Sequence, residues 1–99
     1  MNQSFVLSAR AKRDLRAAKA ESLKRWSAEQ TNLYLASIES RLMWLAANPQ
    51  LGKHRDEVRE GLRSYTEGRH VIFYRVGTDT IEIVGVPHQR QDLNRHFQP

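Results

Sequence analysis

The chain has 99 residues, of which 39% are hydrophobic and 27% charged, with no cysteine and a formal net charge of +5. These values fit one globular domain spanning residues 1–99, and they exclude disulfides, thiolate nucleophiles and cysteine-ligated metals. No apolar run approaches the roughly 20 residues that cross a bilayer and the N-terminus lacks a secretory signal pattern, so we expect a cytoplasmic protein without membrane contact.

The basic residues are concentrated at the front of the chain. Residues 1–26 contain seven Lys or Arg against two acidic residues, whereas 27–50 and 77–99 each carry a small negative excess. A positive surface attracts polyanions or acidic partner proteins. A solvated helix face that keeps a small protein soluble explains the same pattern equally well.

The first half of the chain is expected to form a short strand and two helices. Residues 5–7 are an apolar run, and the hydroxyl of Ser8 can cap a helix over 9–26, which contains no Gly or Pro. Ser27 can cap a second helix, and Asn48-Pro49 ends it because the residue before a proline is pushed out of helical geometry. The very short connection predicts an antiparallel helical hairpin.

The two helices carry apolar stripes of different size. On the first helix the stripe is thin and made mostly of small residues, which allows a close approach to a neighbour. Its members are Ala11, Leu15, Ala18, Ser22 and Trp26. The stripe on the second helix is larger, and we expect it in the core rather than in a partner-binding groove. Its members are Leu35, Ile38, Leu42 and Leu45.

The second half is expected to form three strands. A polar connection over 49–61 leads to strands over 62–66, 69–76 and 80–86, separated by short turns that contain glycine. Both faces of the middle strand are largely apolar, which is typical of a central strand covered on both sides. Pro87 has no amide hydrogen to donate, so we expect strand pairing to stop there.

This order of elements predicts an α+β fold. An N-terminal strand precedes a helical hairpin, which packs on one face of an antiparallel β-sheet, and residues 89–97 form a short C-terminal helix. The three later strands pair as a meander. The spacing does not decide whether the first strand joins the sheet at an edge or at its centre.

A cluster of polar residues follows the last strand and could carry chemistry. His88 could act as a general acid or base, and Arg90 could bind a phosphate. The alternative, which we favour from the residues alone, is structural. In that case Asp92 pairs with Arg90 or caps the last helix, while His88 satisfies buried backbone groups.

A second set of candidate residues lies on the predicted strands. Arg63, Arg75, His70 and Tyr74 could surround a scissile phosphate if they converged on one surface. The alternation of a strand places Arg75 on the face opposite His70 and Tyr74, which argues against one cluster. In the structural alternative, His70 and Tyr74 fill the core while Arg75 extends to water.

No metal or cofactor is expected. The four histidines show no paired ligand spacing, and the chain contains neither a glycine-rich phosphate-binding motif nor a Gly-x-Ser-x-Gly motif.

Taken together in this order, these motifs resemble the ParE branch of the RelE/ParE toxin superfamily. The matching pieces are Leu7-Ser8-x-x-Ala11 with Asp14-Leu15, Arg25-Trp26, Tyr34-Leu35, Leu45-Ala46-Ala47-Asn48-Pro49, Leu51-Gly52, Gly61-Leu62-Arg63, His70-Val71-Ile72-Phe73-Tyr74-Arg75 and His88-x-Arg90-x-Asp92-Leu93. Each piece is weakly specific alone, but their order within 99 residues is more specific. The resemblance implies the RelE/ParE-like fold described above.

The resemblance also implies a function. ParE-like proteins are toxins of bacterial type II toxin–antitoxin modules, and characterised members poison DNA gyrase. A ParD-like antitoxin holds them inactive by wrapping its C-terminal segment around the toxin, through helix-in-groove and strand-addition contacts. We therefore expect gyrase and a ParD-like antitoxin as partners, with the helical hairpin and a sheet edge as the antitoxin-docking surface. Nucleic acid would be contacted only indirectly, through partner complexes.

Three hypotheses follow for the active surface. In the first, the protein acts by binding rather than by catalysis, and Arg63, His88, Arg90 and Arg95 contact gyrase. In the second, it is a RelE-like ribosome-dependent ribonuclease, with His88 as acid or base and Arg63 and Arg75 on phosphate. In the third, it is a non-toxic module that only binds an antitoxin.

Overall fold

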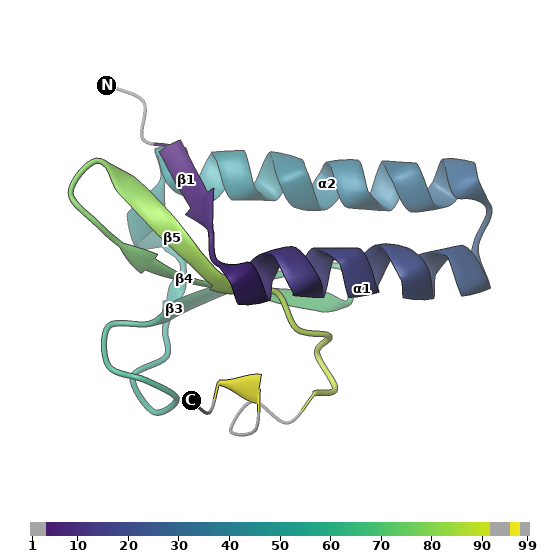
Figure 1. The fold of residues 1–99 in the computed structure, drawn as a ribbon. Coiled ribbons are helices and arrows are strands. Elements are labelled where there is room, and N and C mark those ends of the chain that lie inside the picture. Colours follow the sequence, from purple (N-terminus) through teal and green to yellow (C-terminus); the bar gives the residue numbers. More distant parts are fainter. Residues whose placement is uncertain (1–3, 92–95, 98–99) are drawn as a thin grey trace.

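The computed structural model describes residues 4–91 and 96–97, which form two helices and a five-stranded sheet (Figure 1). In chain order the elements are β1 (Ser4–Leu7), α1 (Ala9–Arg25), α2 (Ala28–Ala47), the 3-10 helix η1 (Pro49–Leu51), β2 (Lys53–His54), β3 (Arg63–Glu67), β4 (His70–Val76) and β5 (Thr80–Gly85). The predicted α+β fold is confirmed. Neither helix is both long and apolar enough to cross a membrane, as judged over the described residues.

Side-chain caps start both helices, as the sequence predicts. The Ser8 hydroxyl accepts a hydrogen bond from the Ala11 amide at 3.0 Å, and the Ser27 hydroxyl accepts one from the Gln30 amide at 3.1 Å. Each cap satisfies one of the amides that the first helical turn leaves without a partner. α2 stops at Ala47, immediately before Asn48 and Pro49.

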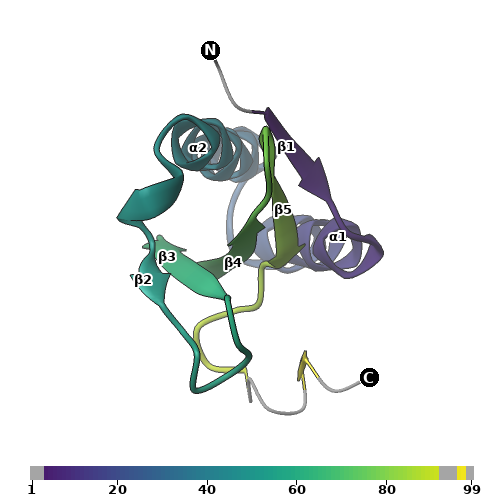
Figure 2. The same ribbon diagram turned by 90° about the vertical axis from the view of Figure 1, so that its left-hand side faces the viewer.

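The sheet has the strand order β1-β5-β4-β3-β2, so β4 lies at its centre. Neighbouring strands from β2 to β5 are antiparallel, which confirms the meander. The position of β1, left open by the sequence, is at the edge. It runs parallel to β5, with Phe5 opposite Ile81 and Leu7 opposite Ile83 (Figure 2).

The central strand is covered on both faces, as its composition predicts. On one face Ile72 and Tyr74 pack in one cluster with Ala11 of α1 and with four buried residues of α2, which are Ile38, Leu42, Leu45 and Ala46. On the other face Phe73 joins a second cluster with Leu62, Val84 and Phe97. Ile72, Phe73 and Tyr74 have no exposed surface.

One local prediction was wrong. Pairing does not stop at Pro87, because the Pro87 carbonyl accepts from the Val71 amide at 2.9 Å and His88 then forms a bridge with His70. A proline lacks only the donor, so its carbonyl can still take part in a ladder. The polar connection over 49–61 contains two short elements that the sequence did not predict, η1 and the two-residue strand β2.

The buried Tyr74 hydroxyl ties the sheet to this connection. It donates to the Pro49 carbonyl at 2.8 Å and accepts from the Gly52 amide at 2.9 Å. The backbone of Gly52 approaches so closely that a Cβ there would lie 2.2 Å from the hydroxyl oxygen. Only glycine therefore fits at this position without moving the tyrosine.

Residues 92–95 of the predicted C-terminal helix over 89–97 lie outside the described residues. Within the described part, the Gln91 amide donates to the His88 carbonyl at 2.9 Å in a turn, and Phe97 packs into the second cluster.

Replacing Tyr74 with phenylalanine should lower the free energy of unfolding by about 1–3 kcal/mol, because the buried Gly52 amide and the partly buried Pro49 carbonyl lose their partner. Urea denaturation measures the change. Tyr65→Phe is the matched control, since the Tyr65 hydroxyl makes no hydrogen bond with another described residue and the ring keeps its packing on Trp44. Equal losses in the two variants would contradict the role assigned to the Tyr74 hydroxyl.

Candidate partner-binding site

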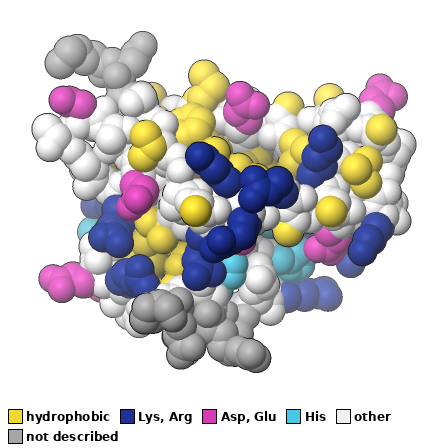
Figure 3. All heavy atoms as spheres, in the orientation of Figure 1, with side chains coloured by type: hydrophobic (Ala, Val, Ile, Leu, Met, Phe, Trp, Pro, Cys, Tyr) yellow, Lys and Arg dark blue, Asp and Glu magenta, His cyan; other side chains and the backbone are white. Residues whose placement is uncertain are grey.

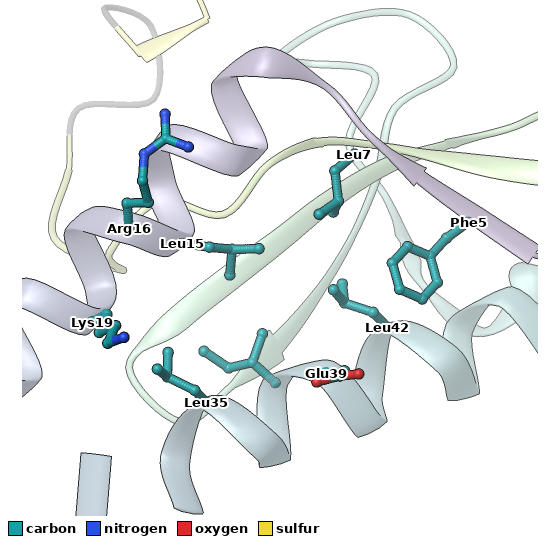
Figure 4. Close-up of a pocket in the computed structure, with 9 residues that line it drawn as sticks. Phe5, Leu7, Leu15, Arg16, Lys19, Leu35, Glu39 and Leu42 are labelled. Atoms are coloured by element: carbon teal, nitrogen blue, oxygen red, sulfur yellow. The ribbon is translucent and has the colours of Figure 1, made fainter. Parts of the chain in front are cut away.

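An apolar groove of about 370 Å³ opens between α1, α2 and β1 (Figure 4). Its lining is formed by Phe5, Leu7, Leu15, Arg16, Lys19, Leu35, Ile38, Glu39 and Leu42. The two helices and the strand each contribute at least one apolar side chain that faces this space. Concave apolar surfaces with a few polar groups at the margin are the usual form of a binding site.

The groove exists because α1 does not cover the apolar surface of α2 completely. The buried residues of α1 are the small Ala11, Ala18 and Ser22. Leu15 and Leu35, on opposite sides of the groove, remain only half-buried. The sequence predicted a stripe on α2 that belongs to the core. Ile38, Leu42 and Leu45 are indeed buried, but Leu35 is not, and it lines the groove together with Ile38 and Leu42.

The margins of the groove differ in charge. Arg16 and Lys19 stand on the α1 side, and Glu39 stands on the α2 side (Figure 4). Arg16 and Lys19 belong to a larger basic surface, since Lys and Arg side chains gather over α1 in the space-filling view (Figure 3). The predicted concentration of positive charge on the first helix is therefore present at the surface.

A group of polar and aromatic side chains joins the helical hairpin to the end of the sheet. The Tyr34 hydroxyl and His70 Nδ1 share a hydrogen bond of 2.6 Å, and the same hydroxyl accepts from the Arg69 amide at 3.0 Å. The guanidinium of Arg69 lies 4.6 Å from the ring centre of Trp26. Together these contacts fix the β3–β4 turn on the connection between the helices.

His70 is held in this group as a buried histidine. It is 6% exposed, and its ring lies 5.5 Å from the ring of His88. Burial lowers the pKa of His70 below its ordinary value, and the nearby His88 lowers that pKa further. His70 and Tyr74 therefore fill the core, as the structural alternative predicted.

A cavity of about 320 Å³ lies beside these histidines. It is lined by Asp14, Ala17, Ala18, Glu21, His70, Val86, His88 and Gln91. Asp14 already accepts from the Val86 amide at 2.8 Å and from His96 Nε2 at 2.9 Å. Its carboxylate thus fastens the chain after β5 to α1. Within residues 4–91 and 96–97, no group of three or more metal-ligating side chains is arranged to hold a metal ion.

His88 and Arg90 lie next to each other in the turn after β5. The Arg90 amide donates to His88 Nδ1 at 3.2 Å, and the His88 amide donates to the Gln91 side chain at 2.8 Å. The His88 ring is half-buried, whereas Arg90 is exposed. Asp92 and Arg95, which the sequence interpretation also singled out, lie outside the described residues.

Arg63 lies away from His88. It pairs with Tyr74 on β4, whereas His88 pairs with His70, four residues along the same strand. At 3.3 Å per residue, these positions are about 13 Å apart along the sheet. The Arg63 guanidinium also holds the connection after α2, because it donates to the carbonyls of Gly52 at 2.9 Å and Gln50 at 3.2 Å.

Arg75 lies on a different face. Tyr74, its neighbour on β4, points into the helical side of the core, and Arg75 is exposed opposite Glu82 of β5. Of the four described residues that the hypotheses assign to the active surface, the structure therefore brings together His88 and Arg90. Arg63 and Arg75 stand apart from them and from each other.

The sequence interpretation assigned none of the groove-lining residues to a groove, because it placed the α2 stripe in the core. Phe5 and Leu7 were assigned to a strand whose position in the sheet was unknown, so it could not be inferred which elements their side chains contact. Arg16 and Lys19 were visible only as part of a basic helix. The one available signal was the small size of the α1 stripe, which predicts incomplete cover of the larger stripe on α2.

Comparison with known proteins identifies relatives along almost the whole chain. The family described as "ParE toxin of type II toxin-antitoxin system, parDE" matches residues 5–93. Toxin ParE1 of Mycobacterium tuberculosis (strain CDC 1551 / Oshkosh) is 37% identical over 98 residues, which cover 98% of this chain and 100% of the relative.

Two solved structures have a similar fold. One, described as the chromosomal ParDE TA system from P. aeruginosa, matches with a TM-score of 0.75 and 19% identity, covering 87% of this chain and 95% of the other. The toxin–antitoxin complex RelBE2 from Mycobacterium tuberculosis matches with a TM-score of 0.61 and 23% identity, covering 89% and 99%. At these identities the likeness concerns the fold alone.

Because the pKa of His70 is lowered in the folded protein, its contribution to the free energy of unfolding should decrease in acid. In the unfolded chain His70 is protonated near pH 6.5, whereas in the folded protein it is protonated only at a lower pH. Its contribution is therefore complete above pH 6.5 and is lost as the pH falls towards the folded pKa. We expect the stability advantage of the native protein over His70→Gln to shrink between pH 7.5 and pH 5, as measured by urea denaturation.

His54→Gln is the control for this experiment, because the His54 side chain is 69% exposed. Its difference from the native protein should stay nearly constant over the same pH range. An advantage over His70→Gln that grows in acid would contradict the assigned burial of a neutral His70.

Proposed function

The chain belongs to the ParE toxin family of type II toxin–antitoxin systems, and on this premise we propose that it inhibits DNA gyrase and is neutralised by a ParD-like antitoxin. Gyrase inhibition is what the ParE resemblance implies, and the match of the family over residues 5–93 is the observation that carries the proposal. The protein acts in the cytoplasm, where both partners would meet it.

The arrangement of the candidate residues supports inhibition by binding rather than by catalysis. A ribonuclease needs an acid, a base and cations around one phosphate. Arg63 lies about 13 Å along the sheet from His88, and Arg75 is exposed on the opposite face from Tyr74. His88 and Arg90, by contrast, share one turn and suit a contact surface for a large partner.

The groove and the neighbouring edge strand support antitoxin binding. The apolar space between α1 and α2 suits the apolar face of a helix, and β1 is paired on one side only among the described strands. These two features match helix-in-groove recognition and strand addition, respectively. The antitoxin would then cover the helical hairpin and extend along the sheet edge.

A ribosome-dependent ribonuclease is the second candidate function. The observation in its favour is His88, whose half-buried ring lines a cavity of about 320 Å³ that Glu21 also lines. Histidine and glutamate are side-chain types that serve as general acid and base in ribonucleases. A third candidate, an antitoxin-binding module without toxic activity, requires only the groove and the edge strand.

One pair of assays separates the three. Purified protein is added to gyrase with plasmid DNA, and separately to translating ribosomes. Loss of supercoiling or trapped cleavage complexes supports gyrase inhibition, and message cut in the ribosomal A site supports the ribonuclease. If neither effect is seen and a ParD-like antitoxin binds tightly, the result supports an antitoxin-binding module without toxic activity.

His88→Ala and Arg90→Ala should each weaken inhibition of supercoiling about tenfold, because each removes a contact from the same exposed turn and truncation of a central contact costs over 1 kcal/mol. Arg75→Ala is the matched control and should inhibit like the native protein, since it lies on another face. The measurement is the protein concentration that halves supercoiling. A loss in Arg75→Ala with none in the other two would reject this surface.

Leu35→Glu should reduce co-purification with a ParD-like antitoxin at least tenfold, because it places a charge in the apolar groove. Leu33→Glu introduces the same change two residues earlier on α2, at a side chain that is 66% exposed and does not line the groove. It should co-purify normally. Circular dichroism of both variants checks that the helices are intact, and equal co-purification of both would exclude the groove as the docking site.

A further inference from the structure

The groove has a property that its apolar lining does not explain. Its two long margins carry opposite charge, with Arg16 and Lys19 on α1 and Glu39 on α2 (Figure 4). None of these three side chains forms an ion pair with another residue in the part of the chain that the structure describes. All three are exposed, so they remain available to a molecule seated between them.

The dimensions of the groove suit about two turns of a helix. Its α2 margin runs from Leu35 to Leu42, and the seven steps between these residues rise about 10 Å in an α-helix. One end of the groove is closed by Phe5 and Leu7 of β1, and the other lies at Lys19 and Leu35 (Figure 4). A bound helix would place three apolar residues, spaced at i, i+3 or i+4, and i+7, against the floor.

The margin charges distinguish the two ways in which such a helix can lie. An amphipathic helix has a flank on each side of its apolar face. Turning the helix end for end keeps the apolar face on the floor but exchanges the two flanks between α1 and α2. A helix with acidic residues on one flank and basic residues on the other therefore meets matching charge in one direction and repulsion in the other.

We propose that the opposed charges at the groove margins set the direction of a bound amphipathic helix, by holding its acidic flank along Arg16 and Lys19 and its basic flank along Glu39. The occupant is a helix of the antitoxin, so the inference rests on the proposed function. The charge pattern then acts as a specificity determinant, because an antitoxin with its acidic residues on the wrong flank would enter in the reverse direction and misplace the segment that follows.

The size of the preference follows from the number of charge pairs. Three exposed pairs change from attraction to repulsion when the helix is reversed, and each is weak by itself. Together they favour the matching direction about tenfold at low salt, and screening reduces the preference as ionic strength rises.

The probe is a pair of synthetic 15-residue amphipathic peptides of identical composition. Each has leucines at the three anchor positions, glutamates on one flank and lysines on the other, and the second peptide exchanges the flanks. A cysteine at the N-terminus of each peptide carries a nitroxide, and the absence of cysteine from this chain keeps the toxin unlabelled. Paramagnetic broadening of the amide signals of isotope-labelled full-length toxin reports where the peptide begins.

One peptide should broaden signals at the Phe5–Leu42 end of the groove about tenfold more than at the Lys19–Leu35 end, and the other peptide should show the reverse. The triple variant Arg16→Glu, Lys19→Glu, Glu39→Lys should invert both patterns. A matched variant with the same change in net charge outside the groove, Arg13→Glu, Lys53→Glu, Glu60→Lys, should keep both native patterns.

Broadening at the same end by both peptides, equal broadening at both ends, or no binding by either peptide would overturn the inference. These outcomes differ from a failure of the proposed function. Co-purification of the Leu35→Glu variant tests whether an antitoxin uses the groove at all, and the peptides test only what the charges at its margins do.

Discussion

The burial of β4 on both of its faces is the constraint on which the rest of the structure depends. Ile72, Phe73 and Tyr74 are successive residues without exposed surface, so each face of one strand needs its own apolar cover. Complete burial of a large apolar side chain stabilises the fold by about 1.5–3 kcal/mol. The helical hairpin supplies one cover. The segment before β3 and the C-terminal Phe97 supply the other.

The cover on both faces of β4 also determines where the candidate residues His88, Arg90 and Arg63 lie. The chain after β5 must continue beside β4 to reach the second face, and it does so through the Pro87 carbonyl and the His70–His88 bridge. His88 and Arg90 are thereby brought to one end of the central strand. Arg63, at the other end, is engaged in holding the connection that the Tyr74 hydroxyl also binds. A sheet anchored at both ends in this way separates the candidate residues rather than collecting them.

Much of the fold could be predicted because it depends on local signals. Ser8, Ser27 and Asn48-Pro49 mark the helix ends through interactions within a few residues, and the two apolar faces of β4 follow from alternation along one strand. The parallel pairing of β1 with β5 could not be predicted, since it joins residues 76 positions apart. The contact between Tyr74 and Gly52 could not be predicted either, for the same reason. At Pro87 the missing amide hydrogen was evident from the sequence, but it did not predict that the carbonyl would accept from the Val71 amide.

The candidate site was harder to predict because it is defined by what the chain leaves uncovered. The motif residues His88, Arg90, Arg63 and Arg75 were conspicuous in the sequence, yet only the first two lie together. The groove has no motif, because it arises from the difference in size between the α1 and α2 stripes. Leu15 and Leu35 stay half-buried beside Arg16, Lys19 and Glu39, and none of these three charged side chains forms an ion pair with another described residue.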